Sequence, residues 1–358
     1  MDFDISEEQE LLQATVRQLA ENECPLTRVR EIFDGDSGHD PELWKSLVEV
    51  GIGGTAIPEE FGGAGLEMLD LALVAECLGS AAVPGPFLGH SLAGLAVLLG
   101  GSDAQKKSWL PRLAMGDALG TVAFAEEGSA WQPNEWTLRA NGTLRGTKKH
   151  VPYGSLADLI VVGTADGGLV LVETARGGVQ SEPVDAADRT RRLDCVSFED
   201  APCETLPDGP RASGRVRDAG LILLSADAYA GAARSLEMAV EYANTRQQFG
   251  VTIGHFQAIK HQLANMAIKV DPVRFLVWYA AHAFDHVPDE SERTAALTKA
   301  HATSVFMQTA RDSVEAHGGI GYTWECDVQI LFKRAMFDRA FLGAPRVHRE
   351  RAAVLSGW

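Results

Sequence analysis

Apolar residues recur at helical spacing in the first part of the chain. The stretch SEEQELLQATVRQLAENE at 6–23 begins with a serine and acidic residues, which is typical of a helix N-terminus, and its later apolar residues recur at helical intervals. The stretches PELWKSLVEVGIGG, MLDLALVAECLGSA and AQKKSWLPRLAMGD repeat the pattern. Pro and Gly in IPEEFGGAG at 57–65 predict a structured turn between two of these helices. We therefore expect an N-terminal α-helical domain over 1–118.

The next part of the chain favours short strands. The runs GTVAFAEE, WTLRAN, GTLRGTKKHVPY, DLIVVGTA, GLVLVETA and VSFEDAP are separated by Gly, Asp and Asn, and Asn141-Gly142 predicts a hairpin turn. PDGPRASG at 207–214 predicts a loop, after which helical periodicity returns and continues to the C-terminus. This order predicts an α+β fold with a middle β-domain over 119–213 and a C-terminal helical bundle over 214–358.

Composition is that of an ordinary globular protein, with 358 residues of which 46% are hydrophobic and 23% charged. Apolar stretches such as LAGLAVLLGG fall short of the ~20 residues that a bilayer-spanning helix needs, so we expect no membrane span. The N-terminus is acidic and lacks the basic segment and apolar core of a signal peptide. We therefore expect a cytoplasmic protein.

Charge and cysteine content restrict the partners further. The formal net charge of −17 argues against a nucleic acid or an anionic membrane, because binding to these requires basic patches. The five cysteines are scattered without a CxxC pair, so neither a metal site nor a disulfide framework is expected.

Two motifs in the last third of the chain carry candidate chemistry. NTRQQFGVTIGHFQAIKHQLANM at 244–266 combines an arginine suited to phosphate, a phenylalanine that offers an apolar plate, and a helix start that favours an anion. Taken alone, this stretch also fits a structural loop. In EAHGGIGYTWE at 315–325, the glycines either admit another molecule close to the backbone or end a helix.

Together with IPEEFGGAG, these motifs resemble the acyl-CoA dehydrogenase family. The resemblance covers essentially the whole chain and implies a helical N-terminal domain, a middle β-barrel domain and a C-terminal four-helix bundle. It further implies FAD as cofactor, an acyl-CoA substrate and an electron-transferring flavoprotein as acceptor. In the family, the two motifs contact the FAD held mainly by the neighbouring subunit. Carried over to this sequence, the cofactor-binding residues are Arg246, Gln248, Phe249, Gln257, Glu315, Gly318 and Gly319.

One of these positions departs from the family pattern. Many relatives have glutamine where this chain has Glu315, and an ionised carboxylate cannot donate the hydrogen bonds that an amide donates.

The family's catalytic base is absent from both of its usual positions. A glutamate removes the α-proton of the acyl thioester while the β-hydride passes to the flavin. Counted from the Gly-Gly pair, its position is Leu342, and the alternative position, counted back from the arginine, is Gly220. We therefore expect no catalytic residue of the usual kind in this chain.

Three carboxylates lie near these empty positions. Asp218 is two residues from Gly220, which places its side chain ~200° around a helix, toward the opposite face. Asp338 and Glu350 flank Leu342, and we expect both to be solvated surface charges.

The residues that would hold this chain's own flavin are also altered. In AFAEEGSAWQ, Ala125 lacks the hydroxyl of the family's threonine and Trp131 stands near the place of a small serine. In KKHVPYG, His150 and Pro152 replace a flavin-stacking tryptophan and a threonine. His150 fits either a ligand contact or an ordinary loop histidine.

The altered and retained positions form a consistent set. The chain resembles the base-lacking subunit of heteromeric α2β2 acyl-CoA dehydrogenases, which hold one FAD per heterodimer and occur in bacterial steroid catabolism. This resemblance implies a second acyl-CoA dehydrogenase-like chain that supplies the glutamate, and a steroid side-chain CoA, although fatty or branched acyl-CoA remains open. Two alternatives are a self-sufficient homotetrameric enzyme with an unusual base, Asp218 first, and a flavin-free acyl-CoA-binding scaffold.

Overall fold

The computed structural model describes residues 4–36 and 38–358, and the chain divides into two compact units. The helical unit comprises the described residues up to Glu31, together with Ala72–Val83 and Leu221–Trp358. The mixed unit comprises the described residues of Ile32–Leu71 and Pro84–Gly220.

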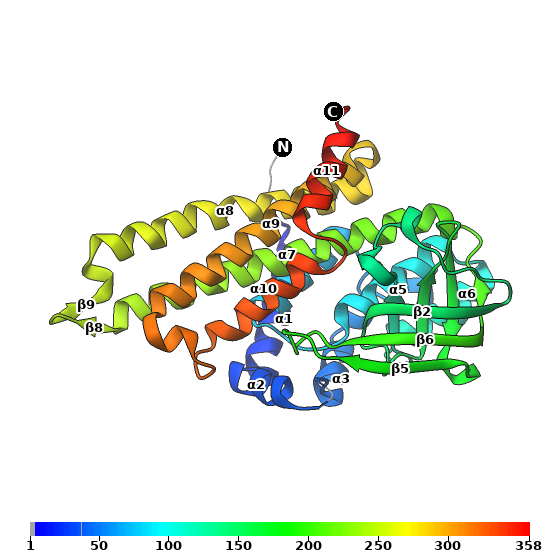
Figure 1. Ribbon diagram of the computed structural model, residues 1–358, viewed down its shortest axis with the longest axis horizontal. Helices are drawn as coiled ribbons and strands as arrows, with labels where there is room; N and C mark the ends of the chain where they lie inside the picture. Colours follow the sequence, from blue (N-terminus) through cyan, green and yellow to red (C-terminus); the bar gives the residue numbers. More distant parts are fainter. Residues whose placement is uncertain (1–3, 37) are drawn as a thin grey trace. The chain divides into compact units, whose positions relative to one another are not determined.

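The helical unit is dominated by long helices, of which α8 and α9 run side by side (Figure 1). Helix α7 packs against both through a buried cluster of Ala239, Met266 and Ala316. A short hairpin of β8 (Gln247–Gln248) and β9 (Val251–Thr252) joins α7 to α8. The helices that lie wholly or partly in this unit are α1 (Glu7–Glu23), α2 (Leu26–Asp34), α4 (Met68–Ser80), α7 (Gly209–Thr245), α8 (Gln257–His286), α9 (Pro288–His317), α10 (Val328–Ala340) and α11 (Pro345–Leu355).

Helix α1 begins where the sequence predicts. The Ser6 hydroxyl accepts the backbone N–H of Gln9 at 3.2 Å, and the Gln9 side chain accepts the backbone N–H of Ser6 at 3.0 Å. This capping box satisfies two backbone donors that the first helical turn would otherwise leave without partners. The helix buries Gln13, Val16 and Ala20, which are spaced three and four residues apart on one face.

The mixed unit contains helices α3 (Pro41–Glu49), α5 (Phe87–Gly100) and α6 (Asp103–Ala114) and two sheets. One sheet has the order β1-β3-β4-β7, in which β1 and β3 are parallel and the other pairs antiparallel. The other has the antiparallel order β2-β6-β5. Their strands are β1 (Gly120–Ala123), β2 (Thr143–Pro152), β3 (Leu159–Gly163), β4 (Leu169–Glu173), β5 (Val179–Val184), β6 (Leu193–Pro202) and β7 (Glu204–Thr205).

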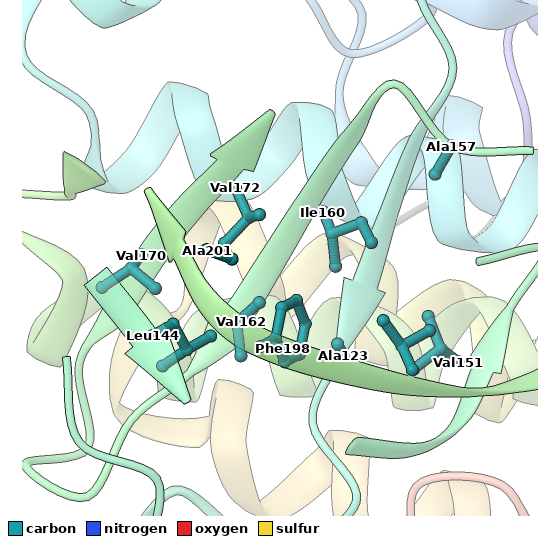
Figure 2. Packing of buried hydrophobic residues seen from close by; sticks show 11 residues of the cluster. Ala123, Leu144, Val151, Ala157, Ile160, Val162, Val170, Val172, Phe198 and Ala201 are labelled. Carbon is teal, nitrogen blue, oxygen red and sulfur yellow. The ribbon is translucent and has the colours of Figure 1, made fainter. Parts of the chain in front are cut away.

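The core of the mixed unit lies between these sheets. Phe198 of β6 packs in one cluster with Leu144 of β2, Ile160 and Val162 of β3, and Val172 of β4, as Figure 2 shows. All of them are essentially removed from solvent. Because so large a ring is enclosed, replacing Phe198 by alanine is expected to cost about 3–5 kcal/mol of unfolding free energy.

The turn predicted at 57–65 is confirmed. Gly62 and Gly65 adopt positive φ values of 82° and 64°, which glycine reaches without steric cost. The backbone N–H of Gly65 donates to the carbonyl of Ile57 at 2.8 Å, and that of Ala64 to the carbonyl of Gly54 at 3.0 Å.

Two sequence-based expectations, at 207–214 and at Asn141-Gly142, are wrong. The loop expected over 207–214 gives way at Gly209 to α7, because Pro210 lies in the first helical turn, where no intrahelical N–H is needed. The hairpin expected at Asn141-Gly142 reduces to a single bridge between Ala140 and Leu144, and β2 pairs instead with β6, far along the sequence.

Across the described residues, no helix combines the length and the apolar character needed to cross a bilayer.

Candidate functional site

A two-residue turn presents Phe249 to solvent. Strands β8 and β9 pair Gln247 with Thr252 and Gln248 with Val251, so Phe249 and Gly250 form the tip. Both tip residues have positive φ, 53° and 82°, as a type I′ hairpin turn requires. Such a φ is unfavourable for phenylalanine, and the ring is 92% exposed. The exposed ring is therefore available to contact another molecule.

The polar residues of the first motif lie around this hairpin. Arg246 follows α7, its carbonyl accepts the backbone N–H of Ile253 at 2.8 Å, and no ion pair of its guanidinium occurs within the described part of the chain. Gln248 is exposed, and its side-chain amide donates to the carbonyl of Gln247. Gln257 is the exposed first residue of α8. The charge of Arg246 is thus free to pair with an external anion.

The second motif ends α9 with an open backbone. Gly318 has a φ of 64° and ends the helix, which confirms the second of the two interpretations of the glycine run. A Cβ built on Gly318 or on Gly319 would meet no atom within 4 Å. The chain's own atoms therefore leave this surface clear, which fits the approach of a flavin nucleotide. The carboxylate of Glu315 pairs with Arg311 at 3.2 Å on the exposed face of α9.

A ring contact that the sequence did not reveal brings the two motifs together. Tyr242 in the last turn of α7 stacks on His317, the last residue of α9, with ring centroids 4.5 Å apart and planes inclined by 25°. His317 Nδ1 also lies 2.7 Å from the carbonyl of Ser313. Tyr242 is four residues before Arg246, and His317 directly precedes Gly318. The closeness of both residues to the motifs in the sequence could have marked them as candidates. Their contact could not be predicted, because it depends on how α7 packs on α9.

Leu342, at the first of the two usual positions of the catalytic glutamate, lies in a turn that is enclosed by other side chains. Leu342 is 0% exposed and has a φ of 59°. Buried Lys299 donates to the carbonyl of Asp338 at 2.5 Å and reaches that of Gly343 at 3.5 Å. His348 Nε2 lies 3.1 Å from the carbonyl of Leu342. These contacts fix the backbone around Leu342.

The expectation that Asp338 is a solvated surface charge is wrong. Its side chain is 0% exposed, because α10 turns this face toward Lys299 of α9. Burial lowers the pKa of Lys299 to about 7 even though the nearby Asp338 opposes that shift. The expectation for Glu350 is confirmed, since it is exposed and pairs with Arg346 at 3.1 Å.

The second empty base position lies inside α7. Gly220 is buried and has no side chain to offer. Asp218, the remaining carboxylate near this position, is also buried, and Arg217 Nε lies 3.1 Å from its Oδ1. The Asp218 carboxylate is therefore enclosed and already paired with a cation of the same chain.

Two of the altered residues of the mixed unit contact each other. Trp131 stacks on His150 with ring centroids 6.0 Å apart and planes inclined by 23°. His150 holds a positive φ of 55°, and burial lowers its pKa. Ala125 is fully buried, and the Pro152 carbonyl accepts the Thr121 hydroxyl at 2.5 Å. The two rings thus lie against each other, which fits poorly with a flavin lying against either of them.

Other site chemistry is limited. Within the described residues, no group of His, Cys, Asp and Glu side chains could hold a metal ion. All five cysteines carry free thiols.

Comparison with known proteins identifies the family. Residues 6–117 match the model of the acyl-CoA dehydrogenase N-terminal domain, and residues 218–354 match that of the C-terminal domain. Acyl-CoA dehydrogenase IpdE2 of Mycolicibacterium smegmatis is 36% identical over 97% of this chain and 98% of its own length. A variant of the Tcur3481-Tcur3483 steroid ACAD superposes with a TM-score of 0.91 and 29% identity over 98% of both chains. The ChsE4-ChsE5 complex of Mycobacterium tuberculosis gives a TM-score of 0.90 and 27% identity over 100% of this chain and 99% of the matched chain. This chain therefore belongs to the acyl-CoA dehydrogenase family and has its fold, with a helical N-terminal domain, a central sheet domain and a C-terminal helical domain.

Proposed function

We propose that this chain is one subunit of a heteromeric, FAD-dependent acyl-CoA dehydrogenase and completes the FAD site of a second acyl-CoA dehydrogenase-like chain. The observation that carries the proposal is a contrast in exposure. The motif residues that face a neighbour's flavin in the family are exposed here, and Gly318 and Gly319 are clear of the chain's other atoms. Leu342 and Gly220 at the base positions are instead buried.

In this proposal, the exposed residues bind and orient the cofactor. The Arg246 guanidinium neutralises the pyrophosphate, and Phe249 packs on the nucleotide or flavin. Gln248 and Gln257 supply polar contacts, and Gly318 and Gly319 admit the cofactor close to the backbone. Glu315, whose carboxylate pairs with Arg311, would contribute only as an acceptor, because an ionised carboxylate has no hydrogen to donate.

The proposed reaction divides between the two chains. FAD, when bound, would supply the acceptor for the β-hydride of the acyl thioester. A glutamate of the partner chain would take the α-proton, which would give the 2,3-enoyl thioester. An electron-transferring flavoprotein would then reoxidise the flavin. Nothing in this scheme requires a proton acceptor from this chain.

Names of similar proteins support the assembly and the substrate class. The Tcur3481-Tcur3483 and ChsE4-ChsE5 structures each carry the names of two components, and the former is called a steroid ACAD. We infer a heterotetramer acting in the cytoplasm on a bulky, steroid-type acyl-CoA. We retain 1–118, 119–213 and 214–358 as its proposed domains.

The self-sufficient alternative is less well supported, because Asp218 is buried and paired with Arg217. The Trp131 and His150 stack likewise argues against an independent flavin site in this chain. The flavin-free scaffold would have no use for exposed motif residues that match the family's FAD contacts.

Co-expression tests the three readings. This chain should be purified alone and together with the acyl-CoA dehydrogenase-like protein encoded beside it, and the visible spectrum and FAD-to-protein ratio recorded for each. The proposal expects one FAD per pair of unlike chains and a colourless lone chain. A yellow lone chain with one flavin per subunit and turnover would overturn it in favour of self-sufficiency, and a colourless complex that binds acyl-CoA would indicate the scaffold.

A further inference from the structure

The helical unit contains a cavity that the proposed function does not use. Its volume is about 920 Å³, and all of its lining residues belong to this one unit. The walls come from α1, α4, α7 and α8 with the segments that flank α1. A volume of this size is in the range that holds a small organic ligand.

A buried carboxylate forms the floor of the cavity. Glu76 of α4 is 5% exposed. The Trp278 indole N–H donates to its Oε1 at 2.8 Å, and the Gln13 amide donates to its Oε2 at 3.2 Å. Arg17 in turn donates to Gln13 Oε1 at 3.0 Å. The floor is therefore held in place by side chains from three different helices.

Two arginines of the cavity carry charge that no short ion pair neutralises. Within the described residues, no carboxylate lies within ion-pair distance of Arg17 or Arg274. Arg274 instead lies over the Trp278 ring, 5.3 Å from its centroid. Glu76 interacts with both guanidiniums at longer range. Arg17, Arg274 and Glu76 therefore form a group of two cations and one carboxylate, within a lining that has five carboxylates and three guanidiniums in all.

The remaining lining sets the size and charge of a suitable ligand. The other lining carboxylates are exposed, as are Arg17 and Arg274, and they disfavour polyanions. One of them, Glu237, already pairs with Arg234 at 3.1 Å. Ala20, Ala230 and the Trp278 ring give the walls an apolar component. The ionisable groups lining the cavity are Asp4, Glu10, Arg17, Glu21, Cys24, Glu76, Cys77, Tyr229, Arg234, Glu237 and Arg274.

We propose that this cavity binds an organic monocarboxylate with an apolar body, whose carboxylate lies between Arg17 and Arg274 and whose body packs against Tyr229 and Trp278. The two guanidiniums without an ion pair offer charge-assisted hydrogen bonds to one carboxylate, and the surrounding carboxylates limit the ligand to a single negative charge. This site is argued independently of the shared FAD site.

Glu76 makes this binding depend on pH. Burial raises the pKa of Glu76 to about 7, against the opposing effects of Trp278, Arg17, Arg274 and Gln13. Protonation of Glu76 removes the negative charge nearest the guanidiniums. Anion binding should therefore strengthen as the pH falls through 7, until the ligand itself becomes protonated.

The experiment uses 2-naphthoate as the ligand and 2-naphthamide as its neutral control, titrated calorimetrically into the full-length protein at about pH 6 and about pH 8. We expect naphthoate to bind more tightly at the lower pH and naphthamide to bind at least about tenfold more weakly than naphthoate. Arg17→Gln and Arg274→Gln should each weaken naphthoate binding about tenfold, whereas Arg346→Gln, which lies outside the cavity, should not. Glu76→Gln should bind equally at both pH values.

Circular dichroism and thermal unfolding establish that each variant is folded. Hydrogen exchange of the unmodified protein with and without naphthoate gives a second measurement that needs no variant, and protection should appear around Gln13 to Arg17 and Arg274 to Trp278. Equal affinity for the acid and the amide, unchanged binding in the Arg17→Gln, Arg274→Gln double variant, or protection confined to other segments would overturn the proposal.

Discussion

Tyr242 and His317 stack with ring centroids 4.5 Å apart, and their contact joins the end of α7 to the end of α9. Tyr242 lies just before the first motif and His317 lies within the second, so the contact helps to set how the Phe249 hairpin and the Gly318-Gly319 backbone are placed relative to each other. If both motifs contact one ligand, holding them in position beforehand lowers the entropy that is lost when the ligand binds.

Replacing Tyr242 by leucine should disturb this arrangement. We expect a loss of about 1 kcal/mol in unfolding free energy beyond the lost burial, because an aromatic pair disappears. The co-purified complex should also retain less FAD. Tyr242→Phe keeps the ring and is the matched control; if both variants lost FAD equally, the stack would have no part in placing the motifs. Chemical denaturation and flavin absorbance measure the two effects.

Phe249 allows the fold and the ligand contact to be separated. Asparagine tolerates positive φ better than phenylalanine, so Phe249→Asn should leave the hairpin intact and the melting temperature unchanged or slightly higher. The complex should nevertheless bind FAD more weakly, by about tenfold, because the apolar plate is gone. Flavin titration of the apo complex measures this. Undiminished affinity would show that the exposed ring does not touch the cofactor.

Arg246 should act through its charge. Arg246→Gln removes the charge from an exposed residue that has no ion-pair partner in the described structure, so we expect little change in stability. Loss of a charge-assisted hydrogen bond should weaken FAD binding in the complex by about ten- to hundredfold. Arg346→Gln, at an exposed and paired site on α11, is the control. A normal FAD content at limiting cofactor would contradict the assigned role.

Glu76 should make stability depend on pH in a defined direction. Its pKa in the folded chain is about 7, above the ordinary value of 4.5, so the folded state binds more protons between these values. Its contribution is therefore fully present below about pH 4.5 and is lost as the pH rises through 7. The difference in unfolding free energy between the wild type and Glu76→Gln should shift by about 3 kcal/mol over this window. Urea denaturation across the window tests it, with Glu10→Gln at the exposed mouth as control. An identical pH profile for the wild type and Glu76→Gln would exclude the buried group as the cause.

Introducing a glutamate at Leu342, the family's usual position for the catalytic base, should destabilise the chain. Leu342→Glu places a carboxylate at a fully buried position held by Lys299 and His348, and it should destabilise the chain by several kcal/mol (about 2–5) without creating dehydrogenase turnover. Leu342→Met conserves apolar character and should fold normally. A folded Leu342→Glu chain that turns over acyl-CoA would mean that this position does reach substrate. Thermal unfolding and a dye-reduction assay distinguish the outcomes.

Local signals in the sequence determined the family, the helical and β regions and the two exposed motifs. The Ser6 cap and the glycine turn at 57–65 depend on interactions within a few residues, which composition and spacing reveal directly. At Phe249-Gly250 the sequence predicted only a loop, and the structure shows the tip of a hairpin. The absence of a glutamate at Leu342 and Gly220 likewise follows from the sequence, by counting residues from the Gly-Gly pair and from Arg246.

Only the tertiary structure showed the features that depend on contacts between elements distant in the sequence. Asp338 is buried rather than solvated because α10 packs on α9, and β2 pairs with β6 rather than closing a local hairpin. The Tyr242 and His317 stack and the cavity around Glu76 each require residues from several helices. Helical periodicity identifies the apolar face of a helix, but it does not specify which other helix covers that face, and burial, pKa and cavity shape all follow from that pairing.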